Sequence, residues 1–158
     1  MESIILTSAF TIIGAIIIFL ISEYIRGYII MPSIELRKYI GVIIAKIIYE
    51  DQYLLNINAG LTSVSRNHEI SEEFKILSSK LKALAHAIIG YDFISKIKLV
   101  PPKIDIDKVS KDLIGISHGI LSYNLSDSTE NQTIAINDIK IRLVEIGGIV
   151  SHDFIGNN

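Results

Sequence analysis

The chain has 158 residues and a mass of 17.6 kDa, the size of one domain with some length left for an anchor or a tail. Hydrophobic residues make up 49% and charged residues 20%, which excludes a chain that is disordered throughout. The absence of cysteine excludes a disulfide scaffold, a cysteine-based zinc finger or iron–sulfur cluster, and a cysteine nucleophile. A net charge of −2 gives no electrostatic footprint for nucleic acid as a partner.

An apolar stretch comes first in the chain and predicts a transmembrane helix over residues 4–24. The nineteen residues from Ile4 to Ser22 carry no charge. As a helix they would be about 28 Å long, close to the roughly 30 Å thickness of the hydrocarbon layer of a bilayer. Their apolar side chains cover every face, which is typical of a membrane span or of the central helix of a soluble bundle. A cleaved signal peptide is disfavoured, because no Lys or Arg precedes the stretch and it is too long for an h-region.

The distribution of cations predicts the orientation of this span. No Lys or Arg precedes it, whereas Arg26, Arg37, Lys38 and Lys46 follow it. Because the side richer in Lys and Arg stays in the cytoplasm, we expect residues 1–3 to lie outside and the chain after about residue 25 to lie inside. The predicted location is therefore the cytoplasmic membrane of the cell, with the lipid bilayer as the first partner.

The next segment, residues 25–32, is predicted to be a linker at the membrane–water interface. The rings of Tyr24 and Tyr28 suit the aromatic belt at this depth, and Arg26 can extend its charge toward phosphate groups. Pro32 is expected to interrupt or restart the helix, because proline lacks an N–H and constrains the residue before it.

A second helix is predicted from Ser33, acting as its N-cap, to about Leu55. Its apolar residues recur at close to helical spacing, which favours a helix in the core of the protein. The alternative is that residues 33–55 form an amphipathic helix that lies on the bilayer or receives a partner helix.

Two more helices are expected before the double proline at 101–102. Residues 56–69 are polar and predict a loop, after which Ser71 would cap a third helix with Gly90 just beyond its end. A short separate helix is expected within residues 91–99. The two prolines that follow must end it. The third helix has the clearest amphipathic stripe in the chain, formed by Phe74, Leu77, Leu81, Leu84 and Ile88.

After this short helix, a fourth main helix is predicted to begin at a capping aspartate, Asp105 or Asp107. Gly115 and Gly119 lie four residues apart in it, and small residues at that spacing let another helix approach closely. Packing within the chain is favoured for these two glycines, with a dimer contact as the alternative. In the span, Gly14 is a weaker candidate for a helix-contact position.

The fourth helix should end near Tyr123, ahead of a loop over residues 124–132. The last element, residues 134–146, is predicted to be a helix that Gly147 and Gly148 end. A strand is the alternative, because residues 139–143 alternate between apolar and charged, but an isolated strand would have no partner.

The predicted fold class is therefore all-α. One N-terminal transmembrane helix would be followed by a cytoplasmic bundle of four to five helices over residues 33–150. Residues 151–158 are expected to form a flexible tail.

No motif in the chain carries recognisable chemistry, so we predict no catalytic, cofactor-binding or metal-binding residues. None of the histidines forms an HxxxH or HxxE pair, although His86 and His118 lie on neighbouring predicted helices. Ser117 and His118 are adjacent, and adjacent side chains on a helix diverge. The glycines match neither GxxxxGK[ST] nor GxGxxG, so no phosphate-binding loop is predicted.

Three helix-packing motifs follow the predicted N-terminal span. They are Arg37-Lys38-Tyr39-Ile40-Gly41, Leu77-Ser78-Ser79-Lys80-Leu81-Lys82-Ala83-Leu84-Ala85 and Leu113-Ile114-Gly115-Ile116-Ser117. With these motifs the chain resembles a loose group of uncharacterised bacterial single-pass membrane proteins with an N-terminal span and a cytoplasmic helical domain. The resemblance implies a bacterial source, and it transfers no activity and no functional residue.

The leading interpretation is a membrane-anchored, non-enzymatic interaction module, such as a scaffold, a regulator or an accessory subunit, with a protein partner or a second copy of the chain. One alternative is a membrane-acting effector or immunity-type protein that self-associates through its span. The other is a small helical enzyme without a recognisable motif.

Overall fold

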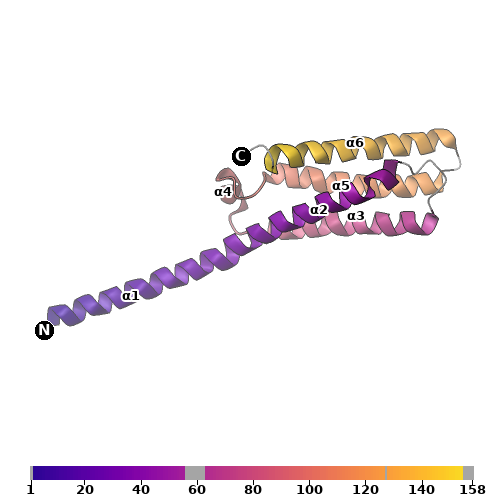
Figure 1. The fold of residues 1–158 in the computed structure, drawn as a ribbon. Helices are drawn as coiled ribbons and strands as arrows, with labels where there is room; N and C mark the ends of the chain where they lie inside the picture. The colour runs from indigo at the N-terminus through magenta and orange to yellow at the C-terminus, as the bar shows by residue number, and fades with distance from the viewer. Residues whose placement is uncertain (1, 56–62, 127, 155–158) are drawn as a thin grey trace.

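The computed structural model describes residues 2–55, 63–126 and 128–154, and most of these residues are helical (Figure 1). The predicted all-α class is confirmed. Residues 134–146 lie within a helix, which excludes the strand alternative. In chain order the elements are α1 (Glu2–Ile25), the π-helical turn η1 (Arg26–Ile30), α2 (Met31–Leu55), α3 (Val64–His86), α4 (Tyr91–Lys96), α5 (Lys103–Leu125) and α6 (Thr129–Phe154).

The first three elements form one uninterrupted helix from Glu2 to Leu55 (Figure 1). At a rise of about 1.5 Å per residue this helix is about 80 Å long. Its first half projects away from the other helices, and its second half packs against them. The expected break at Pro32 is therefore wrong, and the segment predicted as a linker, residues 25–32, is helical.

The helix passes Pro32 because a different donor replaces the missing proline N–H. In an α-helix the N–H at position 32 would bond to the carbonyl of Tyr28, and proline cannot supply it. The Tyr28 carbonyl instead accepts a hydrogen bond from the backbone N–H of Ile89, at 3.5 Å. The proline thus leaves an acceptor free, and that acceptor joins the long helix to the end of the α3–α4 connection.

Two further hydrogen bonds support the helical turn that precedes Pro32. The Met31 N–H bonds to the Arg26 carbonyl, the wider pattern of a π-helix. Ser33 Oγ donates to the Ile29 carbonyl at 2.6 Å. The prediction that Ser33 caps a new helix is wrong, because its hydroxyl supports the preceding turn of an existing one.

The third helix begins earlier than expected. Ser63 is its N-cap and accepts a hydrogen bond from the Arg66 N–H at 3.2 Å. Ser71, the predicted cap, is buried in the middle of α3, and the predicted loop is wrong for residues 64–69. The rest of that loop, residues 56–62, lies outside the described residues.

The ends of the other helices also differ from the predictions. α3 ends at His86, so Gly90 does not follow its C-cap; Gly90 has φ +70° and immediately precedes α4. Pro102, not an aspartate, precedes α5, and Asp105 lies in its first turn. α5 runs two residues past the expected end, to Leu125, and the loop predicted over 124–132 is mostly helical.

The last helix does not stop at its double glycine. α6 continues through Gly147 and Gly148 to Phe154, because glycine inside a helix costs only about 1 kcal/mol relative to alanine and does not remove a hydrogen bond. Part of the predicted tail, residues 151–154, is thus helical. The remaining residues, 155–158, lie outside the described part of the chain.

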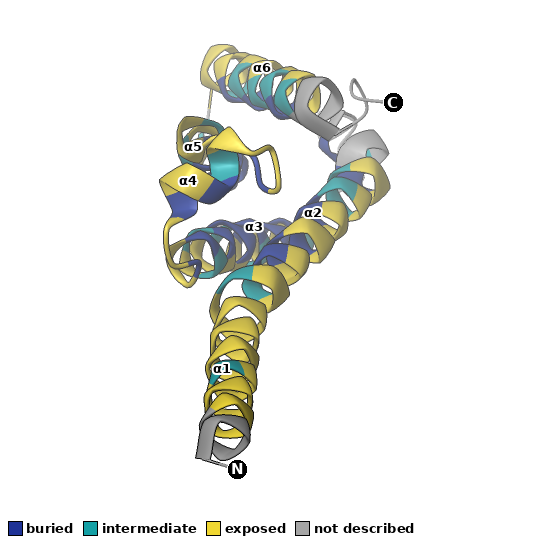
Figure 2. Cartoon of the chain, turned by 90° about the vertical axis from the view of Figure 1, so that its left-hand side faces the viewer, coloured by how far each residue is buried: buried dark blue, intermediate teal, exposed yellow. Residues whose placement is uncertain are grey.

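Four helices, α2, α3, α5 and α6, share one apolar core, which we call the packed region. Figure 2 shows their buried faces turned toward one another. The interpretation of residues 33–55 as a core helix is confirmed for the face that contributes to this core. The largest side chains that are essentially fully buried come from all four helices: Leu36, Ile43, Leu54, Ile70, Phe74, Leu81, Leu113, Ile116, Ile120, Ile136 and Ile139.

Two pairs of buried serines fix how α3 and α5 lie against each other. The hydroxyl oxygens of Ser71 and Ser117 are 2.7 Å apart, and those of Ser78 and Ser110 are 2.6 Å apart. Ser71 and Ser78 also donate to the partner serine's backbone carbonyl, at 3.1 Å and 2.9 Å. The residue numbers rise on one helix and fall on the other, so the two helices are antiparallel.

The two glycines of α5 lie against α6. A Cβ atom on Gly119 would be 2.7 Å from Cγ1 of Ile139, and one on Gly115 would overlap the guanidinium group of Arg142. Both glycines therefore make contacts within the chain, and Gly119 is the stricter of the two because its neighbour is a buried side chain.

We expect Gly119→Ala to destabilise the packed region by about 1–3 kcal/mol, because the added methyl group forces Ile139 out of a filled core. The matched control is Gly147→Ala, where nothing lies within 4 Å and the gain in helix propensity should stabilise α6 slightly. Thermal unfolding of the full chain in mild detergent measures both. Equal effects of the two substitutions would contradict the close approach of α5 and α6.

Candidate functional site

The projecting half of the long helix exposes its apolar side chains. Figure 2 shows α1 as exposed almost throughout, in contrast to the packed region. It belongs to the one described helix that is long and apolar enough to cross a membrane, with a mean hydropathy of 2.1 over its most apolar window and none of that window buried. Its large side chains, each more than half exposed, are Phe10, Ile12, Ile13, Ile16, Ile17, Ile18, Phe19, Leu20 and Ile21.

The residues predicted to mark the membrane–water interface lie at the base of this projection. The rings of Tyr24 and Tyr28 are 4.8 Å apart between centroids, and Arg26 forms an exposed ion pair with Glu23 at 3.6 Å. Both tyrosines are about half exposed. A Cβ atom added at Gly14, the predicted contact position, would meet nothing within 4 Å beyond its chain neighbours and the backbone of its own helix.

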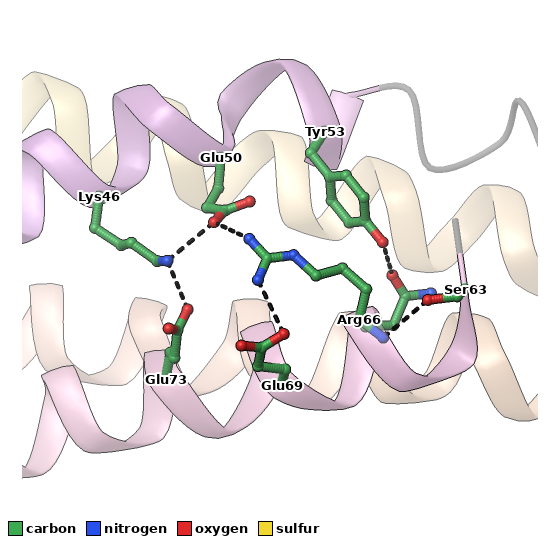
Figure 3. A network of polar contacts seen from close by, with 8 residues as sticks. Lys46, Glu50, Tyr53, Ser63, Arg66, Glu69 and Glu73 are labelled. Atoms are coloured by element: carbon green, nitrogen blue, oxygen red, sulfur yellow. Dashed lines mark hydrogen bonds and ion pairs between the residues drawn. The ribbon is translucent and has the colours of Figure 1, made fainter. Parts of the chain in front are cut away.

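At the other end of α2, a network of charged side chains joins α2 to α3 (Figure 3). The carboxylate of Glu50, with only 2% of its side chain exposed, accepts hydrogen bonds from Lys46 at 2.9 Å and from Arg66 at 2.8 Å. Lys46 also pairs with Glu73 at 2.6 Å, and Arg66 pairs with Glu69 at 2.9 Å. Burial alone would lower the pKa of Lys46, but its bonds to Glu73 and Glu50 raise it overall.

A second set of hydrogen bonds, beside this network, reaches α5. The hydroxyl of Tyr53 donates to Oδ1 of Asn67 at 2.9 Å, and Nδ2 of Asn67 donates to Oδ1 of Asn124 at 2.6 Å. Asn67 is 1% exposed, so its polar atoms need these partners. The chain of bonds links α2, α3 and α5 at the end of the packed region farthest from α1.

A second group of charges lies between α5 and α6, beside an open groove. Arg142 on α6 donates to Asp138 at 2.9 Å and to Asp112 on α5 at 3.2 Å. Its guanidinium group passes over Gly115, where any side chain would block it. The other carboxylate oxygen of Asp112, Oδ2, is buried with no hydrogen-bond partner among the described residues. Burial therefore raises the pKa of Asp112, with a further contribution from Glu145, and Arg142 opposes this shift.

The histidines and serines of interest do not come together. In the antiparallel register that pairs Ser71 with Ser117, His118 lies near the level of residue 70 of α3, which is about 24 Å along that helix from His86. Ser117 is buried and bonded to Ser71, whereas His118 is exposed and lines the groove. Within residues 2–55, 63–126 and 128–154, no three His, Asp or Glu side chains are grouped as metal ligands would be.

The polar network around Glu50 is not among the features predicted from the sequence. The spacing of Lys46 and Glu50, one helical turn apart, was a visible signal for an ion pair. Nothing in the sequence indicated that Arg66 would reach the same carboxylate, since that contact depends on how α2 and α3 pack.

Comparison of the chain with models of protein families, with curated proteins and with solved structures gave no match. The candidate site therefore depends on the geometry described above. Its strongest element is the exposed apolar helix α1, which continues without a break into the packed region.

We expect Glu50→Gln to lower the free energy of unfolding by about 1–3 kcal/mol, because the neutral amide removes the buried negative charge that Lys46 and Arg66 share. The control is Glu69→Gln, which removes the partner of Arg66 whose side chain is 60% exposed and should change stability by less than about 0.5 kcal/mol. Thermal unfolding in detergent compares the two variants. If Glu69→Gln had the larger effect, the central role of Glu50 would be wrong.

The raised pKa of Asp112 predicts a pH dependence with a definite sign. A carboxyl group whose pKa is higher in the folded chain binds more protons when folded, so this group favours folding as the pH falls toward its ordinary value of 3.8. Its penalty is fully present once the pH lies above the pKa in the folded chain. We therefore expect the stability of the natural chain, relative to Asp112→Asn, to rise as the pH falls from 7 to 4.

The measurement for Asp112 is the difference between the two unfolding free energies at each pH, which cancels the titration of other groups. A stability of the natural chain, relative to Asp112→Asn, that stays constant or falls on acidification would show that the ion pair with Arg142 outweighs the burial of the carboxylate.

Proposed function

We propose that this protein is a membrane-anchored, non-enzymatic helical interaction module, acting as a scaffold, regulator or accessory subunit at the cytoplasmic face of a membrane. The observation that carries the proposal is the bare apolar helix α1, exposed from Phe10 to Ile21 and continuous with the packed region. A bilayer would cover these side chains, and the packed region would stand next to it as a cytoplasmic helical bundle.

The buried polar side chains bond to one another inside the packed region, which leaves its exposed apolar side chains as the surface for a partner. Glu50, Asn67 and the serine pairs hold helices together by bonding to one another, so these groups serve the fold. The outer faces of the bundle offer large apolar side chains for contact with a partner. On α6 these are Ile134, Ile141 and Val144, which are 61%, 58% and 74% exposed, and on α2 they are Val42, Ile48 and Tyr49.

The orientation follows from the cations. Arg26, Arg37, Lys38 and Lys46 follow the apolar stretch and none precedes it, which favours a cytoplasmic bundle and an N-terminal end on the outer side. A bacterial source, implied by the resemblance of the sequence, would make this the inner face of the cytoplasmic membrane.

Membrane placement can be tested with single cysteines, because the chain contains none. In sealed cells we expect a membrane-impermeant maleimide to label Ser3→Cys but not Leu125→Cys, and to label Leu125→Cys once the cells are opened. Ile16→Cys should react only after detergent is added. A full chain that stays in the supernatant after ultracentrifugation without detergent would contradict the anchor, and labelling of Leu125→Cys in intact cells would reverse the orientation.

The partner can be sought with a photo-crosslinking residue in native membranes. Placed at Ile141 it should give one defined adduct, whereas the same residue at Ile16 should react mainly with lipid. Failure to form any protein adduct from Ile141, Val144 or Tyr49 would contradict the interaction module. An adduct between two copies through the span would instead favour the self-associating effector.

A further inference from the structure

The segment around α4 lies at the end of the packed region where the long helix emerges (Figure 1). Two hydrogen bonds hold it there. The Ile89 N–H bonds to the Tyr28 carbonyl at 3.5 Å, and Arg37 Nη2 donates to the Lys98 carbonyl at 3.1 Å. The segment is thus fixed at both ends to the part of the helix that immediately follows α1.

One face of α4 is used for packing inside the chain. Tyr91 and Ile94 are 8% and 3% exposed, and the Tyr91 hydroxyl donates to the Pro101 carbonyl at 2.8 Å. These contacts set the rotation of α4 about its own axis, so its other face must point away from the core.

The other face of the segment is apolar and open. Phe93 and Ile97 are one helical turn apart, which places their side chains next to each other. Residues 89–104 carry three exposed lysines, Lys96, Lys98 and Lys103, and one aspartate, Asp92, a net charge of +2 for this segment, and Asp105 and Asp107 follow it in α5. We call residues 89–104 the α4 patch; its exposed apolar side chains are Ile89 (47%), Phe93 (65%), Ile97 (50%), Leu99 (43%) and Ile104 (75%).

The long helix sets the distance between the α4 patch and a bilayer. Tyr28, which binds Ile89, lies six residues beyond Ser22, the last uncharged residue of the apolar stretch. Six residues of helix are about 9 Å, and the headgroup layer on each side of a bilayer is roughly 5–8 Å thick. The α4 patch therefore stands at the outer edge of the headgroups, and any tilt of α1 toward it brings it closer.

We propose that the α4 patch docks on the surface of the bilayer that holds α1, with Phe93 and Ile97 entering the headgroup layer and Lys96, Lys98 and Lys103 binding anionic phospholipids. The proposal rests on the proposed membrane anchor and adds a second contact with the same lipid surface. Apolar side chains surrounded by lysines are the combination by which peripheral segments bind anionic membranes.

The absence of tryptophan from the chain allows a direct test. The full chain with Phe93→Trp is reconstituted, one copy per nanodisc, in phosphatidylcholine containing one-third phosphatidylserine. We expect the tryptophan emission to shift to shorter wavelength and to be quenched by lipids brominated near the headgroup. The matched control is Leu125→Trp, an 82% exposed position at the opposite end of α5, which should be neither shifted nor quenched.

A third variant separates this proposal from the anchor on which it rests. Ile16→Trp reports on the span, and quenching of Ile16→Trp without quenching of Phe93→Trp would overturn the docking and leave the anchor intact. Absence of quenching at both positions would overturn the anchor as well. Shielding of Phe93→Trp that appears only when several copies share a vesicle would assign the patch to a second copy and would also overturn the docking.

The lysines can be tested by changing either the lipid or the chain. Each lysine close to an anionic surface strengthens binding by about fivefold. Removal of phosphatidylserine, or the triple change Lys96→Gln, Lys98→Gln and Lys103→Gln, should therefore reduce the quenched fraction of Phe93→Trp and leave that of Ile16→Trp unchanged. Quenching of Phe93→Trp that is insensitive to both changes would overturn the role given to anionic lipids.

Discussion

The described part of the chain leaves the apolar side chains of α1 uncovered, and contact with water is unfavourable for them. Nine large apolar side chains between Phe10 and Ile21 are more than half exposed. Burying the rest of their surface is worth on the order of 10–20 kcal/mol, which equals or exceeds the roughly 5–15 kcal/mol net stability of a whole domain. No rearrangement of the packed region supplies cover on that scale without uncovering its own core.

The helix is continuous from Glu2 to Leu55, so the direction of α1 is fixed relative to the packed region. A proline that breaks a helix would leave a joint between α1 and the packed region. Here the Tyr28 carbonyl finds a donor in Ile89, and Ser33 reinforces the turn before it. The result is a stiff connection, in which the direction of the first half of the helix determines where α4 and the ends of α3 and α5 stand.

The sequence predicts the helices far better than it predicts where they begin and end. Periodic apolar residues such as Phe74, Leu77 and Leu81 identify α3, because one face must be buried whatever the partner is. Ser33 and Ser71 are predicted to be caps and are not. A serine hydroxyl bonds equally well to the start of its own helix, to the preceding turn or to another helix. Which of these it does depends on its neighbours in space, which a single sequence does not contain.

The same reason limits prediction of the candidate site. The uncharged run from Ile4 to Ser22 is a property of consecutive residues, so it is visible directly. The convergence of Lys46 and Arg66 on Glu50 and the passage of Arg142 over Gly115 join residues of different helices. Gly115 and Gly119 could be recognised as places of close approach because four-residue spacing is local, whereas the helix that approaches them, α6, could not be identified.

The two serine pairs between α3 and α5 determine what kind of movement this protein can use. Their spacing of seven residues repeats after two helical turns, so both pairs are satisfied in one register. A shift by a single turn would set each serine opposite a larger side chain and strand its hydroxyl in a dry interface. Sliding of α5 along α3 by a whole helical turn is thereby disfavoured, and the two helices are held in this one register.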